Sequence, residues 1–431
     1  MKATDFAVVG GGVIGMNVAC ELRRRHPRAS VRLLEKEVAP GLHASGRNSG
    51  VLHAGFYYSA DSLKARFTRT GNALMQAYCD EKGLRVNRCG KLVVARDESD
   101  LPGLAELLRR GRANGVPLDE VSERDAREIE PRVKTFRKAL FSPSTATVEP
   151  AEVMRAFTED ARRLGVDVVL GCAYRGRRGR LVRTSGGEFE CGYLVNAAGL
   201  HADTIARDHG FSERYRVLPF KGLYLYSSEP AGAFRTNIYP VPNLRNPFLG
   251  VHFTVTTDGH AKIGPTAIPC LWREQYGWGA NFRLPEFAQV LGSSLELVMR
   301  AGFDFRGLAL EEVRKYHRPY LVAQAARLAE GIRVEQYARW GRPGIRAQLV
   351  DMKSRTLVQD FCIEGDDRSL HILNAVSPGW TCAIPFSRFV CDQAEARLSR
   401  VAPVASVDGC RCCNAGRCRA DPAISSEAGE P

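Results

Sequence analysis

Three glycines near the N-terminus have the spacing of a phosphate-binding turn. A Gly-x-Gly-x-x-Gly pattern, Gly10-Gly11-Gly12-Val13-Ile14-Gly15, directly follows the apolar run Phe6–Val9. In this pattern Gly10 permits a tight turn, Gly12 lets the backbone approach a pyrophosphate, and Gly15 lets a helix pack closely on a strand. Unpaired N–H groups at the start of that helix favour an anion. The turn therefore predicts dinucleotide binding, although a tight turn with a purely structural purpose has the same pattern.

An acidic residue follows the turn at the distance that a ribose contact requires. The helix-forming run Asn17–Arg24 comes first, and the apolar stretch Val31–Leu34 then ends in Glu35 and Lys36. This order is a strand, turn, helix and second strand, which places the Glu35 carboxylate where ribose hydroxyls can donate hydrogen bonds to it. We include Lys36 in the predicted cofactor contacts. At this point either NAD or FAD fits the pattern.

A second informative stretch, residues 43–55, favours FAD over NAD as the predicted cofactor. Small residues alternate here with polar ones, directly after the ribose-binding strand. Such a loop suits the phosphates and ribityl chain of a flavin, because bulky side chains would block their approach. The contacts predicted from this loop are Ser45, Asn48, Ser49 and Gly50.

The composition is that of an ordinary globular protein with more than one domain. The chain has 431 residues, of which 44% are hydrophobic and 25% are charged, and this length favours two domains. It has no apolar run of about 18 residues, so no transmembrane helix is expected. The stretch from Phe6 to Cys20 is broken by glycines and does not fit a signal peptide. We therefore expect a cytoplasmic protein.

The formal charge of +13 favours an acidic partner. The basic residues are dispersed, and no basic stretch interleaves aromatic residues, so we expect no nucleic-acid binding. The basic clusters are either solvated surface or a peripheral contact with the anionic inner face of the cell membrane. The oligomeric state stays open.

The cysteines divide into two groups. Nine are scattered singly in apolar settings, as expected of buried thiols in a reducing compartment. The other four, Cys410, Cys412, Cys413 and Cys418, lie in the tail 401–431, which we expect to be disordered. Their spacing does not match common zinc sites, so we predict no metal, and adventitious thiols are the alternative that we favour over a metal or cluster site.

Strand-like and helix-like segments alternate along the chain. Helices are expected over 62–83, 101–115, 149–163 and 382–398 and within 282–331. Strands are expected over 91–95, 166–170, 180–184, 193–199, 222–226, 248–256, 345–349 and 371–375. Pieces typical of a nucleotide fold recur at 193–206 and 371–395, which favours interleaved domains. We predict an α/β fold (α+β mixed) with a Rossmann-like FAD-binding domain, 1–80, 140–215 and 345–400, interleaved with a substrate domain built on a mixed β-sheet, 81–139 and 216–344.

Several motifs together resemble one known family. They are residues 48–58, 89–95, 196–200, 219–222, 237–242, 247–254, 263–265 and 344–348, in that order along the chain. The sequence is similar to the flavin-dependent oxidoreductases of the D-amino-acid-oxidase superfamily, and most similar to the L-2-hydroxyglutarate dehydrogenase/oxidase branch. The resemblance implies FAD as cofactor. It also implies that Ala197, Ala198 and Gly199 line the pyrophosphate and that Gly379, Trp380 and Thr381 reach the flavin ring end.

The resemblance also assigns residues to the chemistry. Oxidation of a 2-hydroxy acid removes the hydroxyl proton while the C2 hydride passes to flavin N5, and a neutral imidazole can accept that proton near pH 7. The motifs make His252 the base, with His53 as an alternative base or an orienting group. Arg346 resembles the superfamily's carboxylate-binding arginine, with a surface salt bridge as its alternative. Lys221 either binds a distal carboxylate or ends a strand. Tyr58 and Tyr239 either line the pocket or belong to the core.

We therefore predict that the protein oxidises a small carboxylate substrate. The reaction that we favour is oxidation of L-2-hydroxyglutarate to 2-oxoglutarate, with quinone or oxygen as electron acceptor. A related activity on glycerol 3-phosphate or on an amino acid such as glycine, sarcosine or a D-amino acid is the alternative. A flavin module that modifies tRNA is a third possibility, and only the positive charge supports it.

Overall fold

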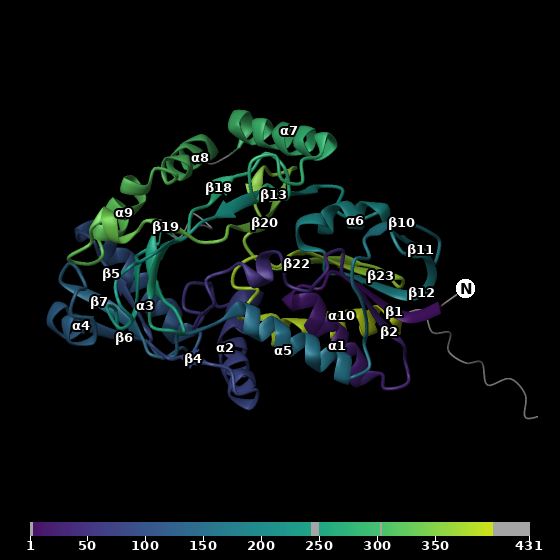
Figure 1. The fold of residues 1–431 in the computed structure, drawn as a ribbon, viewed down its shortest axis with the longest axis horizontal. Coiled ribbons are helices and arrows are strands. Elements are labelled where there is room, and N and C mark those ends of the chain that lie inside the picture. Colours follow the sequence, from purple (N-terminus) through teal and green to yellow (C-terminus); the bar gives the residue numbers. More distant parts are fainter. Residues whose placement is uncertain (1–2, 243–249, 302–303, 400–431) are drawn as a thin grey trace, which may run out of the picture.

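The computed structural model describes residues 3–242, 250–301 and 304–399 (Figure 1). Its largest parallel sheet is built around β1 (Ala3–Val9). This strand pairs on one side with β2 (Val31–Leu34), which in turn pairs with β9 (Asp167–Val169). On its other side β1 pairs with β12 (Gly187–Asn196), which pairs with β23 (Ser369–Asn374). All these pairings are parallel, so the carboxyl ends of the strands meet at one edge, where ligands of such sheets bind.

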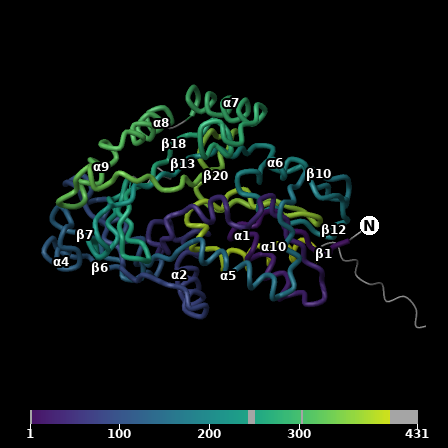
Figure 2. Tube along the Cα trace, viewed as in Figure 1, coloured from purple at the N-terminus to yellow at the C-terminus, as the bar shows by residue number. Residues whose placement is uncertain are grey.

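Helices cover both faces of this sheet because β1 is apolar on both sides. Phe6 and Val8 belong to a core that includes α1 (Val13–Arg25) and α10 (Ala383–Leu398), and Ala7 and Val9 pack on the opposite side. The first and last helices lie side by side, purple and yellow in Figure 2, and the Ser387 hydroxyl donates to the carbonyl of Ile14. Segments from the two ends of the chain therefore build one layer.

The second part of the molecule is built on mixed sheets. One has the strand order β19-β14-β17-β16-β15-β5-β7-β6, a second has β18-β13-β20-β21, and a small one has β3-β8-β4. The remaining helices are α2 (Leu63–Glu81), α3 (Leu101–Ala113), α4 (Glu123–Ile129), α5 (Pro150–Arg163), α6 (Ala202–Asp208), α7 (Leu284–Arg300), α8 (Phe305–Arg314) and α9 (Arg318–Ala326). The strands of these mixed sheets are β3 (Val51–Leu52), β4 (Val86–Asn87), β5 (Lys91–Val94), β6 (Asp119–Ser122), β7 (Lys138–Ser142), β8 (Ala146–Val148), β13 (Tyr215–Gly222), β14 (Leu225–Tyr226), β15 (Asn237–Pro240), β16 (His252–Val255), β17 (Ala261–Gly264), β18 (Ile268–Pro269), β19 (Arg339–Trp340), β20 (Gly344–Asp351) and β21 (Thr356–Leu357). Antiparallel strands β10 (Tyr174–Arg178), β11 (Leu181–Thr184) and β22 (Cys362–Gly365) extend the sheet of β1 instead.

The mixed α/β architecture and most of the expected elements are confirmed. The expected helices correspond to α2, α3, α5 and α10, and the expected helical region 282–331 contains α7, α8 and α9. The single strand expected over 222–226 is wrong: β13 ends at Gly222 and β14 begins at Leu225. Leu223 instead exchanges hydrogen bonds with Thr266, which turns the chain out of the first sheet. The cysteine-containing tail 401–431 lies outside the described residues.

The predicted domain boundaries stay a prediction, but strand pairing bears on one of them. β20 pairs along its whole length with β13, so residues on both sides of the predicted boundary at 344/345 share a sheet. The nine cysteines in the described part of the chain are free thiols, and seven of them are buried. Among the described helices, none combines the length and apolarity that a membrane span requires.

Candidate active site

One cavity of about 700 Å³ runs from the carboxyl ends of β1 and β2 to the sheet that contains β13 and β20. It is lined by the glycine turn, the end of β2, the loop before β3, the end of β12 and the loop before α10. Most of the residues predicted to bind the cofactor lie on its wall: Gly10, Gly12, Val13, Ile14, Glu35, Lys36, Ser45, Asn48, Ser49, Ala197, Gly199, Gly379, Trp380 and Thr381. Segments that are far apart in sequence thus converge on one site.

Two other glycines of the prediction lie off the cavity wall and act through packing. A Cβ on Gly15 would lie 1.9 Å from the carbonyl oxygen of Gly10, and one on Gly50 would lie 2.1 Å from that of Val148. Gly10 itself has φ +110°, and its Cβ would lie 2.5 Å from the carbonyl oxygen of Ala197. These positions exclude any side chain, because the neighbour in each case is backbone.

The beginning of α1 is prepared for an anion. Gly12 is the N-cap residue, the cap has no side-chain hydrogen bond, and the first turn contains no acidic residue. The Val13 N–H donates to the Ser45 hydroxyl at 2.9 Å. Nearby, the buried Glu35 carboxylate accepts from the backbone N–H of Gly11 at 2.8 Å and of Glu37 at 2.9 Å. Glu35 is thereby fixed at the wall of the cavity, and each of its oxygens keeps a lone pair for a ribose hydroxyl.

The cavity fits FAD along its length. Its glycine cradle leaves room for the pyrophosphate at the N-terminus of α1. At the other end, the buried Trp380 Nε1 has no hydrogen-bond partner among the described residues. A donor of this kind on the wall of a cavity is suited to a ligand acceptor. The glycine turn and Trp380 thus offer groups suited to FAD at two places along the cavity.

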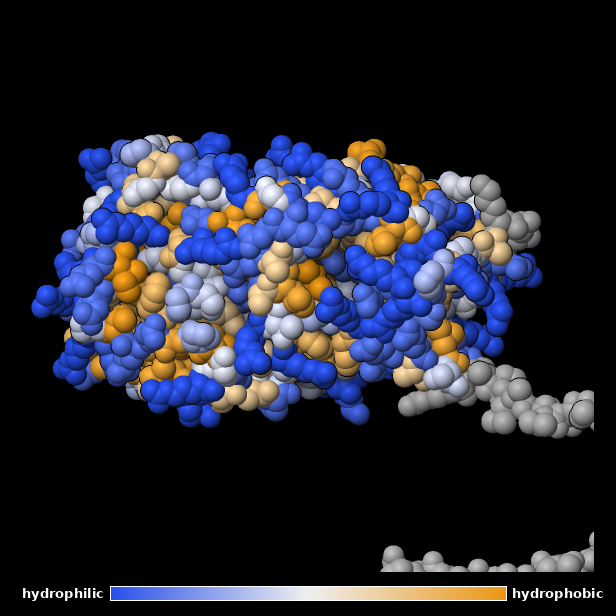
Figure 3. All heavy atoms as spheres, turned by 90° about the horizontal axis from the view of Figure 1, so that it is seen from below, coloured by the Kyte–Doolittle hydropathy of each residue, from blue (hydrophilic) through white to orange (hydrophobic). Residues whose placement is uncertain are grey.

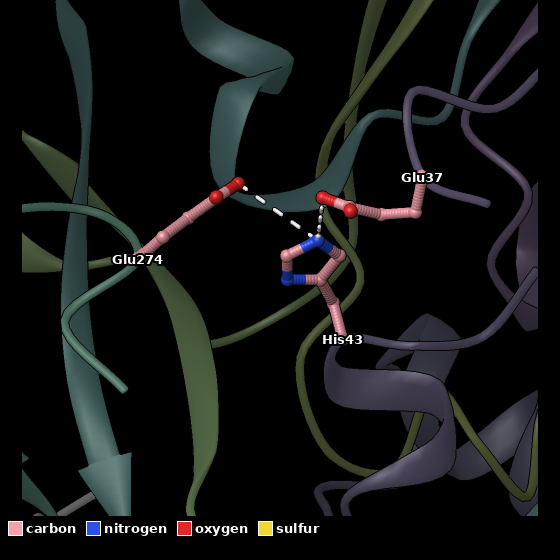
Figure 4. A group of neighbouring side chains, drawn as sticks. All are labelled: Glu37, His43 and Glu274. Carbon is pink, nitrogen blue, oxygen red and sulfur yellow. Dashed lines mark hydrogen bonds and ion pairs between the residues drawn. The ribbon is translucent and has the colours of Figure 1, made fainter. Parts of the chain in front are cut away.

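A group of ionisable side chains lies beside Glu35, and we call it the carboxylate cluster: Lys36, Glu37, His43 and Glu274. Figure 4 shows Glu37, His43 and Glu274. The ligand atoms of Glu37, His43 and Glu274 all lie within 4.8 Å of one another, which is close enough for a metal ion. Lys36 Nζ, however, contacts all three, with 2.9 Å to Glu274 and 3.0 Å to His43 Nε2. The ammonium group thus supplies the positive charge between the carboxylates.

Further hydrogen bonds give His43 and Glu274 of the carboxylate cluster additional partners. His43 Nδ1 hydrogen-bonds to the Tyr276 hydroxyl at 2.7 Å, and His201 Nε2 contacts Glu274 at 2.9 Å. Burial opposes the ionisation of Glu274, but the hydrogen bonds from His201 and Lys36 outweigh it and hold the pKa of this carboxyl well below its usual value. The hydrogen bond from Lys36 likewise lowers the pKa of Glu37. Both carboxylates are therefore ionised and partnered at neutral pH.

The opposite end of the cavity holds His53, Tyr224 and Arg346. The backbone N–H of His53 donates to the Thr381 hydroxyl at 3.1 Å, which ties β3 to the loop before α10. Burial, with a smaller contribution from Lys91, lowers the pKa of His53 well below its usual value. The imidazole is therefore neutral at pH 7.

His252, at the start of β16, is the second predicted histidine. Its Nδ1 donates to the carbonyl of Gly250 at 2.9 Å, which leaves Nε2 as the proton acceptor. The ring stacks on Tyr239 with centroids 3.7 Å apart. Burial lowers the pKa of His252 to about 3, against the hydrogen bond to Gly250. His252 does not line the cavity, but its charge would act on His53.

A second group of polar side chains lies next to these histidines, and we call it the lysine cluster: His53, Tyr57, Lys91 and Tyr239. Lys91 is completely buried at the start of β5, with Nζ 4.5 Å from the ring centre of Tyr57 and 4.9 Å from that of Tyr239. Burial lowers its pKa to about 7. The sequence analysis missed Lys91 as a site residue, although a lysine at the start of an apolar strand is a usable signal.

The other predicted substrate contacts are distributed unevenly. Tyr58 and Tyr239 are enclosed, and burial raises the pKa of both hydroxyls. Lys221 does not line the cavity and lies near Cys270. Burial lowers the pKa of Lys221. Tyr224 and Glu274 line the cavity but were not predicted. Both come from the second part of the molecule, where no sequence motif relates them to the glycine turn.

Comparisons with known proteins agree with this cavity. The family model described as "FAD dependent oxidoreductase" (DAO) matches residues 5–393. The mitochondrial L-2-hydroxyglutarate dehydrogenase of Nematostella vectensis is 35% identical over 92% of this chain and 91% of its own length. The L-2-hydroxyglutarate dehydrogenase of Escherichia coli K12 is 32% identical over 92% and 94%, respectively.

Among solved structures, the L-alpha-glycerophosphate oxidase of Mycoplasma pneumoniae, with FAD bound, has the same fold. It gives a TM-score of 0.74 at 20% identity and covers 92% of this chain and 95% of its own. Because the family model spans nearly all described residues and the relatives exceed 30% identity over most of the chain, the protein belongs to the DAO family of FAD-dependent oxidoreductases.

Proposed function

We propose that this protein oxidises L-2-hydroxyglutarate to 2-oxoglutarate with FAD as its cofactor. The observation that supports the reaction class is the neutral imidazole of His53 with Arg346 at one end of the cavity, and the neutral imidazole of His252 beside them. The substrate follows from the relatives named L-2-hydroxyglutarate dehydrogenase, which align with about nine-tenths of the chain. Fold neighbours such as glycine oxidase are about 20% identical and support the fold alone.

Each residue of the site has a separate role in the proposed reaction. FAD, held by residues such as Gly12 and Glu35, would supply the hydride acceptor for C2. Arg346 binds the carboxylate next to C2, since a planar guanidinium donates two parallel hydrogen bonds to it. His252 Nε2 accepts the hydroxyl proton, so that loss of this proton and of the hydride together yields the ketone. His53 lies on the cavity wall and orients the hydroxyl group.

The low pKa of His252 is consistent with its proposed role as the base. A pKa of about 3 keeps the imidazole unprotonated at pH 7, ready to accept a proton. The carboxylates of a bound substrate raise that pKa, because negative charge stabilises the imidazolium. The stacked Tyr239 ring and the hydrogen bond to Gly250 fix the ring and its tautomer. The base is therefore activated when substrate is bound.

Anaerobic reduction of the flavin tests this function directly. Purified holoenzyme should lose its yellow absorbance on addition of L-2-hydroxyglutarate and should keep it with the D-enantiomer. The comparison panel contains glycerol 3-phosphate, glycine, sarcosine and a D-amino acid. Reduction by one of these compounds, with none by L-2-hydroxyglutarate, would overturn the substrate assignment.

The electron acceptor in this proposal is a membrane quinone or oxygen. Support for a membrane contact comes from an exposed apolar surface on α7, α8 and the loop before them, which lie at the top of Figure 1. Its side chains are Leu271, Trp278, Phe282, Leu284, Leu295, Val298, Met299, Leu310, Val313 and Tyr316. On the opposite face, which Figure 3 shows, apolar residues are scattered among hydrophilic ones.

Charge on the same surface favours an anionic bilayer as the contact. Arg283, Arg300, Arg306 and Arg314 are exposed there, and Trp278 is fully exposed. Apolar side chains surrounded by arginines suit the boundary between headgroups and acyl chains. The protein should sediment with vesicles that contain phosphatidylglycerol and stay in solution with pure phosphatidylcholine. Trp278→Ser combined with Met299→Ser should weaken the sedimentation, and equal sedimentation of the variant would refute this surface.

A further inference from the structure

The lysine cluster contains four buried polar atoms without a hydrogen-bond partner. They are His53 Nδ1, Tyr57 Oη, Lys91 Nζ and Tyr239 Oη, and none has a partner among the described residues. An ammonium can only donate, a tyrosine hydroxyl usually donates when buried, and an imidazole nitrogen donates in one tautomer. The cluster therefore offers up to four donors around one ammonium group and contains no anionic acceptor.

This arrangement is costly unless something binds there. The great majority of buried polar groups are hydrogen-bonded, and a buried charge is normally paired. Three aromatic rings, those of Phe56, Tyr57 and Tyr239, surround Lys91 Nζ at 4.5 to 4.9 Å and offset part of the cost. The rings provide no acceptor for a hydrogen bond. The lowered pKa of Lys91 is the consequence of this burial.

The position of the cluster identifies its ligand as part of the substrate. His53 belongs both to the cluster and to the wall of the FAD cavity, at the end that holds Arg346. Tyr239 carries the stacked ring of His252. A molecule bound to Arg346 with its hydroxyl near the histidines thus has the donors of the cluster at its far side.

We propose that Lys91, with the hydroxyls of Tyr57 and Tyr239, binds the second carboxylate of a dicarboxylate substrate and so selects it over monocarboxylates. This inference rests on the proposed function for the first carboxylate at Arg346. It replaces the role considered for Lys221: neither lysine lines the cavity, but Lys91 Nζ is a buried atom without a hydrogen-bond partner among the described residues and adjoins His53, whereas Lys221 lies beside Cys270. A carboxylate oxygen accepts from the ammonium and from both hydroxyls, which satisfies three of the four unpaired atoms.

Substrate preference in a Lys91→Met variant tests the proposal. L-2-hydroxyglutarate is compared with L-2-hydroxyvalerate, which has the same five carbons but a methyl group in place of the second carboxylate. We expect kcat/KM for the dicarboxylate to fall about 100-fold, mainly through KM, while the value for the monocarboxylate stays or rises. An equal loss for both substrates, or no loss for either, would overturn the proposal.

Lys221→Met is the matched comparison, because it also removes a buried lysine from the second part of the molecule. If it abolishes the preference for dicarboxylates and Lys91→Met does not, the second carboxylate binds at Lys221 and the proposal is wrong. Lys91→Arg keeps the charge and should retain more of the preference than Lys91→Met. Retained flavin absorbance shows that each variant is folded.

A binding experiment separates this proposal from the proposed function. Glutarate has both carboxylates but no hydroxyl group, so it binds without being oxidised, and pentanoate is its monocarboxylate counterpart. Titration of the flavin spectrum should show tighter binding of glutarate than of pentanoate by the wild type and no such difference in Lys91→Met. This result would stand even if L-2-hydroxyglutarate failed to reduce the flavin. Equal binding of both acids by the wild type would refute the site.

Discussion

The carboxylate cluster lies at one end of the cavity, and the lysine cluster lies beside the other end, where only its His53 reaches the wall. The two clusters compensate charge in opposite ways. In the carboxylate cluster, Lys36 contacts Glu37, His43 and Glu274, and His201 adds a further contact. In the lysine cluster, Lys91 has aromatic rings around it and no acceptor among the described residues. Glu274 and Lys91 are both buried, so burial alone does not explain why one is paired and the other is not.

The difference shows how a polar cluster with a structural role can be distinguished from one that binds a ligand. A network in which every donor has an acceptor is complete, and adding a ligand would break contacts already made. A buried ammonium group without an anionic partner is best compensated by an anion from outside. We therefore interpret the carboxylate cluster as a clamp that joins the end of β2 to the loop before α7, and the lysine cluster as part of the substrate site.

The largest expected effect concerns His252, which lies against the lysine cluster. His252→Asn removes the proton acceptor but keeps a polar side chain that can still donate to Gly250. We expect kcat for L-2-hydroxyglutarate to fall by about 10²- to 10⁴-fold, the usual contribution of a general base, with FAD still bound. Stopped-flow reduction of the flavin measures this step.

His260→Asn is the control for this variant, because His260 is half-exposed in the turn between β16 and β17 and contacts Asp258. It should reduce the flavin at the wild-type rate. If His252→Asn also reduced the flavin at that rate, the base would be elsewhere and His53→Asn would be the next variant to measure.

The second effect is on stability and concerns the carboxylate cluster. Glu274→Gln leaves the half-buried Lys36 and His201 side chains with one carboxylate fewer. We expect the free energy of unfolding to fall by about 2 kcal/mol, which lies between the costs of breaking an exposed and a fully buried ion pair. Urea denaturation of the holoenzyme, followed by flavin fluorescence, measures the loss.

The matched variant is Glu120→Gln, which breaks an exposed ion pair with Lys138 of 2.9 Å. It should cost less than about 1 kcal/mol. If Glu274→Gln cost no more than this, the carboxylate cluster would not be a clamp. The preference for dicarboxylates over monocarboxylates should be the same in both variants.

The sequence predicted the nucleotide half of the cavity better than the substrate half, for a physical reason. Gly10, Gly12, Gly15 and Glu35 act through backbone geometry within one strand–turn–helix–strand unit, so their spacing alone carries the information. The role of Lys91 depends on the aromatic rings that pack around it, one of which belongs to Tyr239 in another strand, so its local sequence does not reveal that role.

Lys221 and Glu274 illustrate the same limit in opposite directions. The prediction considered Lys221 for the substrate site, but β13 carries it to Cys270 and away from the cavity wall. Glu274 had no motif of its own, yet a loop more than 200 residues along the chain brings it to Lys36. In both cases the decisive contact depends on how distant segments pack, which local patterns do not encode.

The smallest expected effect is a pH dependence that only the lysine cluster should show. Burial lowers the pKa of Lys91 from 10.5 in the unfolded chain to about 7 in the folded protein. Between these values the unfolded state binds a proton that the folded state does not, so the stability of the wild type rises with pH by up to about 1.4 kcal/mol per unit. Lys91→Met lacks this group and should be the more stable protein at pH 7.

The stability gap between Lys91→Met and the wild type should therefore narrow as the pH rises from 7 to 9. The gap between Glu274→Gln and the wild type should stay constant, because the Glu274 carboxyl has a lowered pKa and remains ionised throughout this range. Urea denaturation of ligand-free holoenzyme at pH 7, 8 and 9 measures both gaps. A Lys91→Met gap that does not change with pH would mean that the folded protein keeps Lys91 protonated, and the two clusters would then differ less than their contacts indicate.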